Sequence, residues 1–148
     1  MKLIKYFFEF LIIILLFLLF KLLGYKISSK FSGFFFRLFG PFFRSKKIIK
    51  SNIKKALPEV EDSELSNIIK NMWSNYGKIL SDYIFIKKFR HSQLEKHLKI
   101  EGVEILQKIK LENKSVIFIS GHFNNFELMA MQIEKSGINL GAIYRPLN

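Results

Sequence analysis

A long apolar stretch near the N-terminus is the strongest constraint on what this chain can fold into. Residues 10 to 20 are unbroken apolar, and the wider stretch from Leu3 to Leu23 has only three charged residues, Lys5, Glu9 and Lys21. As a helix rising about 1.5 Å per residue, this stretch is roughly 31 Å long, which matches the hydrocarbon thickness of a bilayer. A membrane-spanning helix is therefore favoured over the alternative, a buried core helix of a soluble domain.

The residues that follow the apolar stretch are strongly basic. Ten lysines and arginines and no acidic residue lie between Phe10 and Pro58. A cleaved signal peptide does not fit, because no small-residue cleavage site follows and Lys21, Lys26 and Lys30 would oppose translocation. The positive-inside rule predicts instead a single-pass membrane anchor, residues 1–25, with everything after it in the cytoplasm.

Residues 26–58 interleave basic and aromatic side chains and are predicted to be a separate juxtamembrane segment. This composition suits an anionic membrane surface, with the basic groups on phosphates and the phenylalanine rings at the acyl boundary. Two plainer explanations stay open: a solvated basic helix face, and a genome whose base composition favours Lys, Ile, Asn and Phe. The net charge of +12 does not point to nucleic acid, because the excess lies beside the apolar stretch and no nucleic-acid-binding signature is present.

Residues 59–148 are predicted to form the first part of an α/β domain. Before it, a helix is expected from Ser45 to Leu57, where Pro58 stops it. A longer helix is expected to contain Leu65 to Ile84, because apolar residues recur there at helical spacing. This helical region leads into the part of the chain where strands are expected.

Strand and helix patterns alternate in the last third of the chain. Apolar runs bounded by turn signals predict strands at His97–Glu101, Ser115–Ile119 and Leu140–Tyr144. Helices are expected between them at Val103–Leu111 and Asn125–Ser136. This order predicts right-handed crossovers and a parallel sheet with an exposed edge. The fold class predicted is therefore α/β.

The strongest chemical signal is the sequence SGHFNNFE at residues 120–127. On a continuous helix His122 and Glu127 would lie about 140° apart, on different faces. The pair therefore makes chemical sense only across a bend between a strand ending near Ile119 and a helix that contains Glu127. His122 would then lie at the carboxyl end of a strand, where open α/β sheets bind ligands.

A histidine and a carboxylate in this arrangement can act as an acid/base dyad. His122 can take a proton from a hydroxyl, while Glu127 holds the imidazole in one tautomer and stabilises its charged form. The chain has no cysteine, and Ser120 would point to the opposite face of the strand, so no local nucleophile is present. The chemistry predicted is therefore direct attack of an acceptor hydroxyl on an activated acyl group.

Two other readings of the same residues stay open. Asn124 and Glu127 also fit a helix capping box, which a strand-to-helix turn needs whether or not it is catalytic. A metal centre on His122 and Glu127 would lack an obvious third ligand, so no metal site is predicted.

Two motifs resemble a known family. The stretch SGHFNNFELMA at 120–130 and YRPLN at 144–148 look like the bacterial lipid A biosynthesis acyltransferases, the lauroyl/myristoyl transferase family. That family carries a His-x4-Asp/Glu motif, usually Gly-His-Phe-Gly-Asn-Trp-Glu, and a downstream Tyr-Arg-Pro. Asn124 stands where the family commonly has Gly, and Phe126 where it commonly has Trp. Neither departure removes a proton-carrying group.

The resemblance implies roles for four residues. His122 resembles the catalytic base of the family and Glu127 its paired carboxylate. Arg145 and Asn125 are expected to bind substrate, with Arg145 a candidate for contacting phosphate or the acyl carrier. No bound cofactor is expected, since acyl carrier protein or coenzyme A brings the acyl group. The implied fold is a transmembrane helix, a helical region, and the first strands of a sheet like that of glycerolphosphate acyltransferases.

The activity implied by the resemblance is transfer of a fatty acyl chain from acyl carrier protein to a hydroxyl of a lipid A precursor, in lipopolysaccharide biosynthesis. The expected place is the cytoplasmic side of the bacterial inner membrane, with membrane phospholipids as further partners and no nucleic acid. Two alternatives remain: a glycerolipid acyltransferase, since those enzymes resemble this chain in using His-x4-Asp, and a non-catalytic membrane-anchored scaffold.

The resemblance covers most of the chain but only the first half of a family member. The sequence stops at Asn148, within the second motif. We therefore expect a fragment or truncated gene product whose sheet is incomplete.

The apolar stretch and its basic flank generate a prediction about topology. We expect the protein to stay in membranes during washing with high salt or alkaline carbonate, because a helix of this length buries its apolar surface in the bilayer. A reporter fused after Asn148 should be active in the cytoplasm. Release of the protein into the soluble fraction, or a periplasmic reporter, would contradict the anchor.

Overall fold

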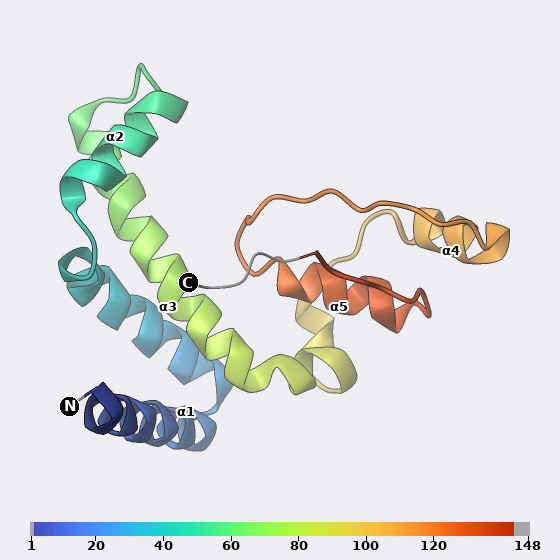
Figure 1. Ribbon diagram of the computed structural model, residues 1–148, viewed down its shortest axis with the longest axis horizontal. Helices are drawn as coiled ribbons and strands as arrows, with labels where there is room; N and C mark the ends of the chain where they lie inside the picture. Colours follow the sequence, from blue (N-terminus) through green and yellow to red (C-terminus); the bar gives the residue numbers. More distant parts are fainter. Residues whose placement is uncertain (1, 144–148) are drawn as a thin grey trace. The chain divides into compact units, whose positions relative to one another are not determined.

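The computed structural model describes residues 2–143, with side chains from Leu3, and its regular elements are all helical over that range. They fall into two compact units, residues 1–85 and 86–148. The helices are labelled in Figure 1: α1 Lys2–Phe39, α2 Lys46–Ala56, α3 Asp62–His91, α4 Val103–Glu112 and α5 Glu127–Lys135.

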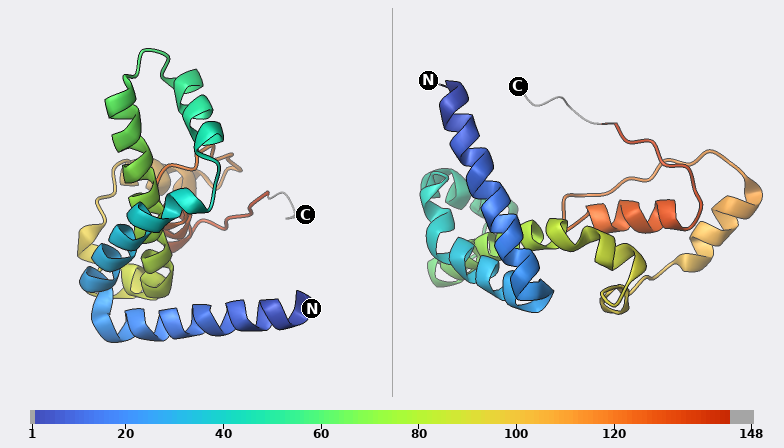
Figure 2. Two further views of the ribbon diagram at one scale, coloured as in Figure 1. Left: turned by 90° about the vertical axis from the view of Figure 1, so that its left-hand side faces the viewer. Right: turned by 90° about the horizontal axis from the view of Figure 1, so that it is seen from below.

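Helix α1 is broken at Gly24. The backbone there has φ 74° and ψ 164°, a conformation open in practice only to glycine. Figure 2 shows the result in its left view: the first arm of α1, in dark blue, runs in a different direction from the second arm. The break therefore divides one long apolar helix into a first arm up to Leu23 and a second arm from Tyr25 to Phe39.

The first arm has the length and composition of a membrane-crossing helix. Only 6% of its most apolar 18-residue window is buried inside the structure, and side chains such as Leu3, Ile12 and Leu22 are exposed. It is therefore not the core helix of the first unit, which was the alternative left open by the sequence.

The second arm of α1 packs closely against α3 through small residues. Ser28 and Ser32 on α1, and Gly77 and Ser81 on α3, are buried. A Cβ placed on Gly77 would lie 2.2 Å from the carbonyl oxygen of Ser32, so the two backbones nearly touch. The Ser28 hydroxyl donates a hydrogen bond of 2.8 Å to the carbonyl oxygen of Phe20, across the break. That bond ties the two arms together.

The apolar core of the first unit lies between α2 and α3. Ile49 of α2 is buried with Leu65, Ile69 and Trp73 of α3. The last three recur every four residues, so they line one face of α3. The predicted helices over Ser45–Leu57 and Leu65–Ile84 are therefore confirmed, and α3 extends further in both directions than the apolar pattern indicates.

The second unit contains the end of α3, a short 3-10 turn at Glu95–His97, and helices α4 and α5. Both helices expected in this part of the chain form close to their predicted bounds. Helix α4 ends at Asn113, which adopts the left-handed conformation expected of a C-cap asparagine.

The predicted α/β sheet is wrong. Within residues 2–143 the structure has no strand, and the segments predicted as strands have no regular structure apart from the turn at His97. Ile117 and Ile119 are 89% and 93% exposed, so the apolar run of the second predicted strand is not buried against a sheet or helix. A β-branched run favours extended backbone locally, but a strand exists only when another strand pairs with its N–H and C=O groups.

The contact between Ser32 and Gly77 generates a prediction about stability. We expect Gly77→Ala to lower the free energy of unfolding by about 1–3 kcal/mol, because the new methyl group meets backbone and the helices must move apart. The measurement is the melting temperature of the purified protein in detergent. Gly33→Ala is the matched control, since its Cβ meets only side-chain atoms of Ser74 and Lys78 at 3.1 and 3.2 Å, which can move. Equal melting temperatures for the two variants would contradict the close approach.

Candidate active site

His122 lies in the irregular connection between α4 and α5. Its side chain is exposed, and its ring packs edge-to-face against that of Phe126, with ring centroids 4.4 Å apart. Asn124, between them, has φ 50°, the left-handed conformation that asparagine tolerates better than most residues. This turn folds the chain back so that the two rings meet. The predicted bend between His122 and Glu127 is therefore present, but it follows no strand.

Glu127 is the first residue of α5 and is partly buried. Among the described residues no hydrogen bond or ion pair joins it to His122. The local bend brings the two residues to the same end of α5 without closing the dyad that the sequence predicts. A change of side-chain conformation, or a bound acceptor between them, is needed for the two groups to share a proton.

The capping-box alternative does not form in the structure. The residue that caps α5 is Phe126, and it makes no side-chain capping bond. The first free N–H groups of α5 are satisfied by backbone instead, with the Leu128 N–H donating to the carbonyl oxygen of Asn125 at 3.2 Å. Asn124 and Glu127 are therefore not used as a reciprocal cap.

The structure places only one of the two expected substrate-binding residues. Asn125 is partly buried and lies two residues before the start of α5. Arg145 lies outside the described residues, so the structure does not place it.

An open apolar groove of about 810 Å³ lies beside His122, entirely within the second unit. Residues from the end of α4, the connection before α5, α5 itself and the segment after it line the groove. Its apolar wall includes Phe118, Phe126, Ile133 and Leu140. A groove of this size and lining suits an aliphatic chain more than a polar ligand. The sequence does not predict this groove, because residues from α4, α5 and the irregular segments beside them form its walls, and periodicity within one segment does not show which segments pack together.

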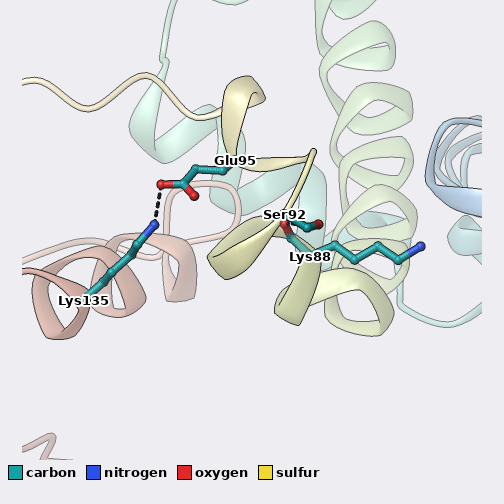
Figure 3. Close-up of polar contacts among 4 residues, drawn as sticks. All are labelled: Lys88, Ser92, Glu95 and Lys135. Carbon is teal, nitrogen blue, oxygen red and sulfur yellow. Dashed lines mark hydrogen bonds and ion pairs between the residues drawn. The ribbon is translucent and has the colours of Figure 1, made fainter.

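Two ion pairs join α5 to the last turn of α3 and to the segment that follows it. Arg90, in the last turn of α3, pairs with Glu134, and Glu95 pairs with Lys135, as Figure 3 shows for the second pair. Ser92 closes α3 by donating a hydrogen bond of 2.9 Å to the carbonyl oxygen of Lys88. The two ion pairs join residues 44 and 40 positions apart, and nothing in the local sequence marks them. They matter for the site because α5 carries Glu127 at its first position.

The pKa of Glu134 is lowered mainly by the hydrogen bond from Arg90. Desolvation opposes this effect, and the charges of Arg90 and His91 make smaller contributions that lower the pKa further. A lowered carboxyl pKa means that the folded state favours the charged form. The pair therefore stabilises the docking of α5 at neutral pH, and this contribution disappears as the pH falls through the carboxyl range.

Comparison with known proteins gives a match to a family model. A family model described as bacterial lipid A biosynthesis acyltransferase matches the chain over residues 1–148. No curated protein and no solved structure gives a significant match. The match includes the first arm of α1, both units and the motif at His122, so the similarity is not confined to the motif.

The ion pair at Glu134 generates a prediction about pH. We expect Glu134→Gln to weaken the protection of α5 amides in hydrogen exchange at pH 7, because the pair with Arg90 is lost. The difference in amide protection between the variant and the unmodified protein should shrink as the pH falls from about 5 to 3. Over this range the carboxyl group of Glu134 becomes protonated in both the folded and the unfolded state. Glu104→Gln on α4 is the control, since Glu104 has no ion pair among the described residues. A difference that stays constant with pH would contradict the assignment.

Proposed function

The chain belongs to the bacterial lipid A biosynthesis acyltransferase family, and from this we propose that it transfers a fatty acyl chain from acyl carrier protein to a hydroxyl of a lipid A precursor. The family assignment makes it an acyltransferase of lipid A biosynthesis. The donor, the acceptor hydroxyl and the roles of individual residues are the proposed part.

The proposed reaction needs one general base. The imidazole of His122 takes the proton of the acceptor hydroxyl as its oxygen attacks the thioester carbonyl carbon. The new oxygen–carbon bond forms, the carbon–sulfur bond breaks, and the imidazolium returns the proton to the leaving sulfur. Glu127 stabilises the imidazolium between these two transfers. No group of the protein is consumed.

One observation supports this chemistry best: an exposed imidazole at the wall of an apolar groove. The exposed ring is accessible to a large, polar acceptor. The groove offers the acyl chain a place out of water, which would hold the thioester end near the imidazole. A solvated histidine with no function would have no reason to lie beside such a groove.

The proposal extends to the remaining roles and to the place of reaction. Asn125 and Arg145 would contact the substrate, with Arg145 on a phosphate group or on the acyl carrier. The first arm of α1 would anchor the protein in the bacterial inner membrane, with the second unit in the cytoplasm, where acyl carrier protein is found. Coenzyme A as donor remains an alternative within the same chemistry.

The open dyad favours one competing function. Since no hydrogen bond or ion pair joins His122 to Glu127 among the described residues, a non-catalytic membrane-anchored scaffold is consistent with the same structure. A scaffold and an enzyme differ in what happens when the imidazole is removed, which is the basis of the following test.

We expect His122→Ala to lower acyl transfer by about 10²- to 10⁴-fold, because a positioned general base contributes roughly that much. Glu127→Gln should also be severely impaired, since an amide cannot stabilise an imidazolium as a carboxylate does. The assay measures transfer from acyl carrier protein to a lipid A precursor in a form of the enzyme that turns over, extended beyond Asn148 if necessary.

His97→Ala is the matched control, because His97 is an exposed histidine of the same unit and should keep normal activity. Melting temperatures should change little in all three variants. Near-normal turnover in His122→Ala rules out the mechanism. Normal turnover in Glu127→Gln alone leaves His122 as the base and makes Glu127 a structural residue.

A further inference from the structure

The second arm of α1 has two faces of different character. Ser28, Ser32 and Phe36, which recur every four residues, face α3 and the core of the first unit. The opposite face carries large apolar side chains that the first unit leaves at least two-fifths exposed, although Phe31 packs edge-to-face against Phe20. We call this set the aromatic face: Ile27, Phe31, Phe34, Phe35 and Leu38, continued past the helix by Phe42 and Phe43.

The aromatic face is too exposed to be an ordinary protein surface. Phe34 is 67% exposed, and Phe42 and Phe43 are 84% and 76% exposed. Isolated apolar residues on a surface need no explanation, but a contiguous set of seven marks a contact with a partner or a membrane. The same arm is well packed on its other face, so the exposure is not the result of an unfolded segment.

Charge restricts what can cover the aromatic face. Basic residues are interleaved in the sequence with the aromatic face and follow it, namely Lys30, Arg37, Arg44, Lys46 and Lys47, and no acidic residue lies between Phe10 and Pro58. Arg37 also donates a hydrogen bond of 3.4 Å to the side-chain oxygen of Asn71. Aromatic rings flanked by lysine and arginine are typical of helices that lie in the plane of an anionic membrane.

The geometry of α1 places this face at the membrane boundary. The apolar helical stretch Leu3–Phe42 has 40 residues. As one straight helix it would be about 60 Å long, twice the hydrocarbon thickness of a bilayer, so it cannot all span. The break at Gly24 comes after the length of a single crossing, and the chain changes direction there (Figure 2). The second arm therefore begins where the first arm leaves the hydrocarbon.

We propose that the aromatic face lies in the boundary between headgroups and acyl chains of an anionic phospholipid bilayer. The second arm is an interfacial helix: Phe31, Phe34 and Leu38 enter the acyl region, and the neighbouring lysines and arginines bind lipid phosphates. Two contacts thus fix the first unit to the membrane. The first arm crosses the bilayer and inserts the protein, and the second arm lies along the interface and sets the orientation of the unit. This inference does not depend on the acyl transfer reaction.

Depth-dependent quenching tests the proposal in the full chain. The chain has no cysteine, so Phe34→Cys and Phe42→Cys each give one site for a small fluorophore. Asn67→Cys, at an exposed polar position of α3, is the matched control. Each labelled protein is reconstituted in vesicles of phosphatidylcholine and phosphatidylglycerol in roughly equal amounts. The quenchers are a lipid with a nitroxide high on its acyl chain and aqueous acrylamide. Fluorescence of the single tryptophan, the buried Trp73, checks that each variant is folded.

The expected result is that the nitroxide lipid quenches the labels at positions 34 and 42 at least about twofold more than the label at 67, with the reverse order for acrylamide. Acrylamide quenching at 34 and 42 equal to that at 67 overturns the proposal, because the face is then in water. Protection of both labels from both quenchers also overturns it, because a second copy of the chain or another protein then covers the face.

The charge part of the proposal has its own measurement. Nitroxide quenching at position 42 should fall when phosphatidylglycerol is replaced by phosphatidylcholine, and Lys46→Gln with Lys47→Gln should reduce that dependence on lipid charge. Equal quenching in the two kinds of vesicle, with or without the substitutions, would show that the basic residues do not bind lipid phosphates and would overturn the anionic bilayer as the occupant.

Discussion

The backbone at Gly24 is the constraint on which the first unit depends. In an apolar helix that continued straight through this position, Ser28 would lie about two turns, or roughly 12 Å, from Phe20, out of reach of its carbonyl oxygen. The conformation at Gly24 is one that a side chain would strain, so the change of direction is built into the sequence at a single residue. The bond from Ser28 to the Phe20 carbonyl oxygen then holds the two arms at the bend.

The close packing of the second arm of α1 on α3 explains why the small residues lie where they do. Backbones that approach as closely as those at Ser32 and Gly77 leave no room for side chains between them. The large side chains of the second arm are consequently forced to the other face, where Phe34 and Phe35 are exposed. Close packing inside and aromatic exposure outside are thus two consequences of one helix contact. If a membrane covers the aromatic face, both faces of the second arm are removed from water.

Long-range ion pairs join α5 to the rest of the second unit. Few of its described residues are buried. Glu134 and Lys135 of α5 pair with Arg90 and Glu95, which lie far away in the sequence. The position of α5 decides where Glu127 lies, while the turn at Asn124 decides where His122 lies. The candidate site is therefore built from two separate local features, the position of α5 and the turn at Asn124. Neither feature by itself brings His122 and Glu127 into a hydrogen bond. A substrate that fills the groove beside His122 would contact both features at once.

The sequence by itself determined the features that depend on near neighbours in the chain. Apolar length identified the first arm of α1, and the motif around His122 indicated the family. Sequence patterns identified α2, α4 and α5 to within a few residues and the central part of α3. Only the tertiary structure decided how these parts meet: which face of α1 is packed, which groove His122 lines, and whether His122 touches Glu127. The predicted sheet failed for the same reason, since the runs at 97–101, 115–119 and 140–144 resemble strands locally, while a strand is defined by hydrogen bonds to another segment. Local propensity is a property of a few consecutive residues, whereas pairing, burial and ion-pair partners are set by contacts that no window of the sequence contains.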